Sequence, residues 1–241
     1  SATVARALSV CVRVPESTAA LAGNDDRVYI SYVKARKAKA LMLAVFCSNT
    51  SSQPISNFVI GFNVPPSSLK VAYAGEPKPA VQGNRARFSI PANGKCTLMA
   101  QVTLASPNGI VAPELPGVAQ YDGTQLEFKV QTDVHDWIRP LPLTVPDFGK
   151  KWTSGQMRES RVSVPRSFSS TQELLDGIGA TFALHQIQAR ASEGILSGTA
   201  AGTPVVILVH GKIGASTTLT VKTQVPSLSA SIAQLIQSGL S

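Results

Sequence analysis

The sequence predicts an antiparallel, immunoglobulin-like β-sandwich followed by a small α+β platform subdomain. Three observations lead to this fold class. Short apolar runs with strand periodicity and turn-rich breaks fill the chain up to about residue 143, a proline-rich connector follows, and helical periodicity occurs only beyond it. We therefore expect two domains, the β-sandwich over residues 1–143 and the platform over residues 144–241.

The first domain is expected to consist of short strands, because its apolar side chains alternate with polar ones over segments of strand length. These segments are Leu8–Val14, Val28–Tyr32, Leu41–Phe46, Phe58–Phe62, Leu69–Tyr73, Ala86–Ile90, Leu98–Leu104 and Leu126–Val130. Turn dipeptides such as Asn93-Gly94 and Asp122-Gly123 separate them. Leu41–Phe46 is apolar throughout, which is typical of a strand covered on both faces.

The second domain begins after a connector that contains Pro140, Pro142 and Pro146, each of which fixes the backbone and lacks a hydrogen-bond donor. Its first long helix is expected to start at the capping box Ser170–Glu173. The next expected elements are a strand around Ile187, a strand over Pro204–Val209, a strand over Thr218–Thr223 and a final helix over Leu228–Leu240. Ser227 is the expected cap of that last helix and Gly239 its expected end.

The composition is that of a globular protein, with 44% apolar and 15% charged residues in 241. No apolar run is long enough to cross a membrane, and the first residues lack the pattern of a signal peptide. The three cysteines, Cys11, Cys47 and Cys96, are an odd number at wide spacing, which fits neither a disulfide framework nor a metal knuckle. We expect buried thiols, no disulfide and a cytoplasmic protein.

The formal net charge of +8 indicates acidic partners without identifying one. The densest basic cluster, Lys34, Arg36, Lys37 and Lys39, lies where two predicted strands turn. A solvated hairpin tip is the commoner explanation for such a cluster. A lipid-binding or nucleic-acid-binding β-sandwich remains an alternative, and binding that weakens steeply with salt would identify it.

Catalytic motifs are missing from the sequence. The three histidines, His135, His185 and His210, are far apart and have no metal-ligand spacing, and neither a nucleophile elbow nor a phosphate-binding loop occurs. Asp147-Phe148-Gly149 lacks the other kinase motifs, so the kinase interpretation fails. We expect no enzyme, no metal and no cofactor; a hydrolase with a site assembled from distant residues stays open.

Three segments of the second domain resemble a known family. Asp147–Trp152 (DFGKKW) resembles the Asp-Phe-Phe-x-Arg-Trp segment that opens the platform of alpha-type adaptins. Thr218–Thr223 resembles the platform strand Arg-Leu-Thr-Leu-Arg-Thr, and Ser229–Gln237 is similar to the closing helix. The chain thus resembles the C-terminal appendage, or ear, of a large adaptin chain of a clathrin-type adaptor complex, in the alpha/epsilon class.

This resemblance implies a protein-recruitment module of a vesicle coat. Its partners would be short motifs of accessory and coat proteins, and the remaining adaptor subunits through an upstream hinge and trunk. No nucleic acid is implied, and contact with the membrane would be only indirect, through the coat. The implied location is peripheral, on coated vesicles at the trans-Golgi network or the plasma membrane.

The resemblance also implies a peptide site. The tryptophan that matches Trp152 lies in a pocket for Phe- or Trp-containing motifs in the alpha-type platform, and Phe148, Lys150 and Lys151 accompany it here. A tryptophan among cations suits an aromatic side chain with an acidic neighbour. Polar contacts could come from two further platform residues on a predicted strand, His210 and Lys212. The alternative is that Trp152 is a core residue that anchors the connector.

The sequence departs from the alpha pattern at several platform positions. Ile207, Val209 and Thr218 stand where alpha chains carry arginine and glutamate, and Gly149 replaces the second phenylalanine. These changes favour the epsilon chain of the fourth adaptor complex, or a divergent alpha chain, with a more apolar peptide pocket. The gamma-coatomer appendage has the same two-part plan and is the competing assignment.

Overall fold

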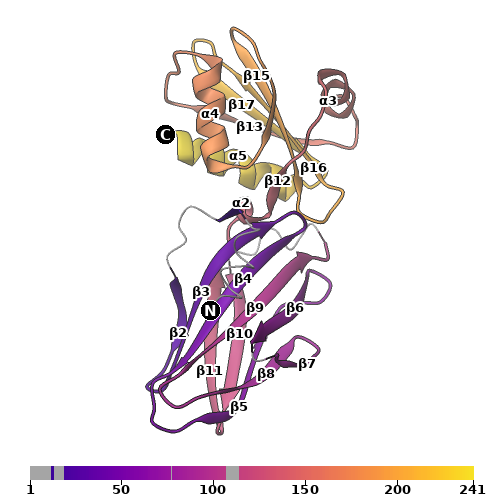
Figure 1. Cartoon of the computed structure of the whole chain (residues 1–241). Helices are drawn as coiled ribbons and strands as arrows, with labels where there is room; N and C mark the ends of the chain where they lie inside the picture. Colours follow the sequence, from indigo (N-terminus) through magenta and orange to yellow (C-terminus); the bar gives the residue numbers. More distant parts are fainter. Residues whose placement is uncertain (1–11, 14–18, 77, 107–113) are drawn as a thin grey trace. The chain divides into compact units, whose positions relative to one another are not determined.

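The computed structural model describes residues 12–13, 19–76, 78–106 and 114–241, and most of the strand expected from Leu8 lies outside these ranges (Figure 1). The chain divides into two compact units after Asp136. The division falls earlier than the residue 143 expected from the proline run, because Ile138–Pro140 pairs with a strand of the second unit.

The first unit consists of two antiparallel sheets. The first sheet has the order β1-β3-β4-β9-β6, with β2 paired to β3, and the second has the order β11-β10-β5-β8-β7. The strands of the first sheet are β1 (Val12–Arg13), β2 (Ala20–Asn24), β3 (Val28–Lys37), β4 (Ala40–Asn49), β6 (Leu69–Glu76) and β9 (Lys95–Leu104). Those of the second are β5 (Ile55–Phe62), β7 (Ala80–Gln82), β8 (Arg85–Ile90), β10 (Glu114–Tyr121) and β11 (Thr124–Gln131).

The core of this unit lies between the two sheets, as alternation along the strands requires. In β4, Leu41, Leu43, Val45 and Cys47 are fully buried, while Met42 and Phe46 on the opposite side are half-buried. Cys47 faces Cys96 across β4 and β9, and both side chains are buried. Burial raises the pKa of both thiols, which makes them poor nucleophiles.

Strand β10 was not expected from the sequence, because Pro116 and Gly117 interrupt its apolar pattern. It nevertheless pairs with β11 over its whole length and with β5 on its other side. The Asp122-Gly123 turn that joins β10 to β11 has positive φ at both residues, which is the conformation that this dipeptide favours.

The second unit is one six-stranded antiparallel sheet with helices. The sheet order is β12-β15-β16-β17-β13, with β14 paired to β15. Its strands are β12 (Ile138–Pro140), β13 (Arg158–Val164), β14 (His185–Ala189), β15 (Glu193–Ala200), β16 (Val206–Lys212) and β17 (Thr217–Thr223). The helices are α3 (Val145–Trp152), α4 (Thr171–Thr181) and α5 (Pro226–Leu240), and the short α2 (Val134–Trp137) precedes β12. The predicted fold class, a β-sandwich followed by an α+β platform, is confirmed.

Helices α4 and α5 pack against one face of the platform sheet (Figure 1). Helix α5 buries Leu228, Ile232, Ile236 and Leu240, as its apolar spacing predicts. It begins at Pro226 without a side-chain cap, so the expected cap Ser227 and end Gly239 both lie inside the helix. Proline suits a first helical position because its missing donor is not needed there.

Strand β15 was missed because two glycines weaken its strand pattern. Both are required by packing: a Cβ on Gly194 would come within 2.7 Å of Leu175 in α4, and one on Gly198 within 2.5 Å of Leu184. The glycines thus allow α4 and the loop after it to lie close to the sheet.

The basic cluster at the β3–β4 turn is only partly a solvated hairpin tip. Lys34 Nζ lies 2.7 Å from the Oδ2 of Asp136, whose side chain is fully buried. Arg36 is half-buried, and desolvation lowers the pKa of its guanidinium. Lys34 and Arg36 are therefore not fully solvated surface cations, which weakens the lipid-binding or nucleic-acid-binding alternative for this cluster. Among the described residues, no helix combines the length and apolar character needed to cross a membrane.

Candidate functional site

The candidate site lies on the outer face of the platform sheet, the face away from α4 and α5. Gly211 faces Leu174 of α4, so the neighbouring residues of β16, His210 and Lys212, point to the opposite side. Val206 and Leu208 share that outer side by the same alternation. The outer face of β16 therefore changes from apolar to basic along the strand.

Helix α3 covers the apolar part of this face. Its first turn is fixed by Thr144, whose Oγ1 accepts a hydrogen bond from the backbone N–H of Asp147 at 3.3 Å and donates one to its carboxylate at 2.7 Å. Phe148 is buried against Val206 and Leu208. Half-buried apolar residues surround this contact; they are Leu141, Leu143, Trp152, Met157, Ile187 and Ile195.

Trp152, at the end of α3, is half-buried and contacts side chains from three elements. Its ring stacks on Phe148 with a centroid separation of 5.3 Å and an interplanar angle of 17°. His210 meets it edge to face at 5.8 Å. Lys222 of β17 places its ammonium 4.5 Å from the ring centroid, within the range of a cation–π interaction. The indole is thus oriented by its neighbours while part of its surface remains exposed.

A carboxylate lies beside each of the two polar side chains that contact Trp152. Lys222 Nζ lies 3.4 Å from Glu159 and also donates to the carbonyl oxygen of Trp152 at 3.3 Å. His210 Nε2 lies 3.3 Å from the carboxylate of Glu193 on β15. Lys222 and His210 are therefore each held in place by a carboxylate on an adjacent strand, which fixes the polar rim of the aromatic cluster.

The structure brings together three of the six predicted site residues, Trp152, Phe148 and His210. Lys150 and Lys151 are exposed on α3, next to Trp152 in the chain. Lys212 is exposed at the end of β16, on the same face as His210.

The sequence-based prediction missed Lys222 and Glu193. Lys222 lies in Thr218–Thr223, the segment that resembles a platform strand. Side chains alternate between the two faces of a strand, so Lys222 shares the outer face with Thr220. Glu193 had no such signal, because strand β15 itself was not recognised. Among the described residues, no group of three or more metal-ligating side chains is close enough to hold an ion.

The second unit is similar to parts of known proteins. Residues 140–239 match a family model described as the appendage platform of the epsilon chain of the adaptin AP4 complex. The human AP-4 complex subunit epsilon-1 is 35% identical over 81 residues, a match that takes in 30% of this chain and 6% of the human protein. Residues 140–239 thus resemble an adaptin appendage platform. The predicted resemblance to an adaptin appendage of the alpha/epsilon class is confirmed.

A solved structure is also similar, although more distantly. The crystal structure of the yeast GGA1 GAE domain aligns with 23% identity and a TM-score of 0.31, over 46% of this chain and 95% of that chain. The chain spans only a small part of the length of the human relative.

Proposed function

We propose that this appendage recruits accessory proteins of a vesicle coat by binding short peptide motifs on the outer face of its platform. The motif would place an aromatic or aliphatic side chain against Trp152, beside Phe148 and His210. Lys150, Lys151 and Lys212 would attract acidic residues that flank it. The other subunits of an adaptor complex would join the chain through sequences upstream, and its location would be peripheral, on coated vesicles at the trans-Golgi network or plasma membrane.

The observation that supports this proposal is the incomplete burial of Trp152. A tryptophan that served only as core would be expected to bury its ring, whereas this one leaves part of an oriented indole exposed. Tryptophan is enriched among the residues that dominate binding energy at interfaces. The neighbouring rings and Lys222 hold the indole in one orientation, so less side-chain entropy is lost when a ligand binds.

The surrounding chemistry favours an apolar anchor with an acidic flank. The residues beneath and around the indole are aliphatic or aromatic, and His210 and Lys222 already have carboxylate partners. The exposed Lys150 and Lys151 lie on the helix that carries Trp152. Anchor burial would then supply most of the affinity, and the lysines would mainly accelerate association.

The test is a binding titration and a thermal melt on the same Trp152→Ala variant. The probes are fluorescent peptides carrying Asp-Pro-Trp, Asp-Pro-Phe or Leu-Phe, measured by anisotropy. Truncation of an interface tryptophan typically costs about 2–4 kcal/mol, so we expect affinity to fall roughly 30-fold to 1,000-fold. The melting temperature should fall only slightly, because the ring is not fully buried.

Tyr29→Ala is the matched control, since Tyr29 is an exposed aromatic residue of the first unit, with 44% of its surface accessible. It should leave peptide affinity unchanged. Lys150→Glu with Lys151→Glu should slow association and reduce its salt dependence. Normal peptide binding by Trp152→Ala, or binding lost only together with the fold, would contradict the proposal and return Trp152 to a scaffold role.

A further inference from the structure

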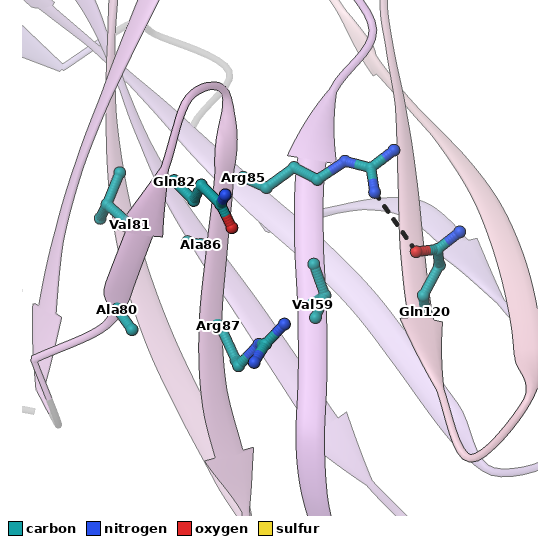
Figure 2. Close-up of a pocket in the computed structure, with 8 residues that line it drawn as sticks. All are labelled: Val59, Ala80, Val81, Gln82, Arg85, Ala86, Arg87 and Gln120. Carbon is teal, nitrogen blue, oxygen red and sulfur yellow. Dashed lines mark hydrogen bonds between the residues drawn. The ribbon is translucent and has the colours of Figure 1, made fainter.

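A second surface, on the first unit, has a different chemistry. The outer face of the sheet β11-β10-β5-β8-β7 contains a hollow of about 670 Å³, drawn in Figure 2. We call it the arginine groove. It is lined by the exposed Arg85 and Arg87 together with residues of three neighbouring strands, namely Val59 of β5, Ala80, Val81 and Gln82 of β7, and Gln120 of β10.

The two arginines lie on the same side of β8. The residue between them, Ala86, is fully buried, so both side chains point outward. Arg85 crosses β5 and reaches Gln120 on β10, with Nη1 3.5 Å from its Oε1 (Figure 2). This path exists because residue 61 is glycine, where a Cβ would lie 2.8 Å from the Cγ of Arg85.

Within the described part of the chain, neither guanidinium has a carboxylate partner. Among the described residues, no Asp or Glu oxygen lies within ion-pair distance of Arg85 or Arg87, and both residues are exposed. Two other arginines, the half-buried Arg27 and the exposed Arg166, are paired: Arg27 lies 2.8 Å from Asp122, and Arg166 lies 3.0 Å from Glu173. The arginine groove therefore presents two cations that remain available to an external anion.

The groove continues along the sheet. A neighbouring hollow of about 350 Å³ shares Val59 and Gln120 with it and extends to Asn57 and Gln125. Carboxamide side chains thus occur along the trough on β5, β7, β10 and β11. Carboxamides can both donate to and accept from a peptide backbone. Such a lining suits an extended chain rather than a compact apolar group.

We propose that the arginine groove binds an acidic peptide segment in an extended conformation. Residues i and i+2 of a strand lie about 7 Å apart on one face, so the backbones of Arg85 and Arg87 have this spacing, and the side chain of Arg85 extends from there toward β10. An extended ligand with several acidic residues can place one carboxylate at each guanidinium, because both arginine side chains are long and exposed. Arginine is also suited to carboxylates because its planar group donates two parallel hydrogen bonds.

The charges of the same face give the ligand a direction. Asp122, at the far end of the trough, is held by Arg27, and Glu127 lies on β11, separated from Arg85 by two strands. The carboxylates of the ligand therefore lie at the two guanidinium groups, between β8 and β10, and away from β11. This site is independent of the aromatic cluster at Trp152, because it belongs to the other unit.

The test uses the whole chain and a fluorescein-labelled peptide, Ser-Asp-Val-Asp-Val-Asp-Ser, measured by anisotropy. The same peptide with Asn in place of Asp is the ligand control. We expect the acidic peptide to bind, with an affinity that weakens between about 50 and about 300 mM salt, and the Asn peptide to bind at least roughly tenfold more weakly. The double variant Arg85→Gln/Arg87→Gln should lose at least roughly tenfold in affinity for the acidic peptide.

Matched variants separate the groove from net charge and from folding. Lys70→Gln/Lys95→Gln removes the same charge from exposed positions on β6 and β9 and should bind normally. Val59→Glu places a carboxylate opposite Arg87 and should weaken binding, whereas Val59→Gln should not. Trp152→Ala should bind the acidic peptide as the unaltered chain does, which separates this site from the platform.

Three results would overturn the proposal. They are equal binding of the Asp and Asn peptides, normal binding by the double arginine variant, and equal losses in the arginine and lysine variants. Vesicles containing phosphatidylserine are the last probe. Arginine-dependent vesicle binding without peptide binding would mean that the groove faces a membrane surface instead.

Discussion

The two tryptophans of the chain end short helices in similar sequence contexts but have different surroundings. Trp137 is the last residue of α2 and has no exposed surface. Trp152 is the last residue of α3 and is half-buried. Both come after charged or titratable residues, in His-Asp-Trp and Lys-Lys-Trp. Local sequence thus does not distinguish a buried tryptophan from one that is partly exposed.

The difference arises from the backbone pairing on the C-terminal side of each tryptophan. Trp137 leads directly into β12, which pairs with β15, and its carbonyl oxygen accepts a hydrogen bond from Ala201 N–H at 2.7 Å. Trp152 leads into a turn at Thr153, whose N–H bonds back to Gly149 of the same helix. Strand pairing fixes the first residue in the sheet, whereas α3 holds the second on the outer face. In these two helices, the last residue is buried where a paired strand follows it and partly exposed where a turn follows it.

The largest expected effect tests the buried member of the pair. Trp137→Ala should lower the free energy of unfolding by about 3–5 kcal/mol, because it removes a large and fully buried side chain. Trp137→Phe should cost less, since it keeps an aromatic ring and removes an indole N–H that has no hydrogen-bond partner among the described residues. Urea unfolding of both variants measures this. A loss below about 1 kcal/mol for Trp137→Ala would show that the ring is not core.

The second effect tests the half-buried member. Trp152→Ala should lower the free energy of unfolding by only about 1–2 kcal/mol, through lost contacts with Phe148 and Leu208. Quenching by acrylamide gives an independent measurement, because it requires contact with the ring. With Trp137→Phe as background, Trp152 emission should be quenched strongly; with Trp152→Phe as background, Trp137 emission should be nearly protected. Equal quenching of the two tryptophans would show that they do not differ in exposure.

Tyr73 extends the comparison of aromatic burial to a side chain that titrates. Burial raises the pKa of Tyr73 from about 10 to about 12, and its hydroxyl donates to the carbonyl oxygen of Asn84 at 2.8 Å. Below pH 10 both states are protonated, so the stabilisation is complete. Between pH 10 and 12 the unfolded chain loses the proton first, so stability falls, by about 1 kcal/mol at pH 11.

Tyr73→Phe isolates this contribution, because it removes the titrating group and keeps the ring. The difference in free energy of unfolding between the original chain and the variant should shrink as the pH rises from 9 to 11. Absorbance at alkaline pH provides a second measurement of the same ionisation. A pH-independent difference would mean that the pKa of Tyr73 is not raised by folding.

The smallest effect concerns the cation above Trp152. Lys222→Met keeps much of the side-chain length but removes the ammonium 4.5 Å from the ring, and should cost about 0.5–1 kcal/mol of stability. Acrylamide should then quench Trp152 more strongly, because the cation no longer holds the indole. Lys222→Arg should retain most of the interaction. Unchanged quenching in Lys222→Met would show that Lys222 does not orient the ring.

Much of the fold could be predicted from the sequence, where periodicity and turn chemistry agree. β3, β4, β9 and α5 were expected because their apolar spacing is regular. β10 and β15 were not expected, because Pro116 in one and Gly194 and Gly198 in the other contradict strand propensity. Those residues are tolerated for tertiary reasons, since the glycines of β15 leave room for α4 and the loop after it.

The candidate site was predictable only in part. The segment Asp147–Trp152 was recognised by its resemblance, and the structure places Phe148 and Trp152 against β16 with His210. Its binding role stays a prediction until peptides are tested. Lys222 became visible only through the register of β16 and β17, which pairs Leu208 with Lys222. The arginine groove had no sequence signal beyond two arginines separated by one residue.

By itself the sequence determined the division into a strand-rich half and a mixed half, since side-chain periodicity and turn residues act over a few neighbouring positions. It also determined the alternation that places Arg85 and Arg87 on one face of β8. Only the tertiary structure decided that Trp137 is buried, that Trp152 is partly exposed and that Arg85 reaches Gln120. These outcomes depend on strand register and on glycine at position 61, which bring together residues that are distant in the chain and that no local pattern can pair.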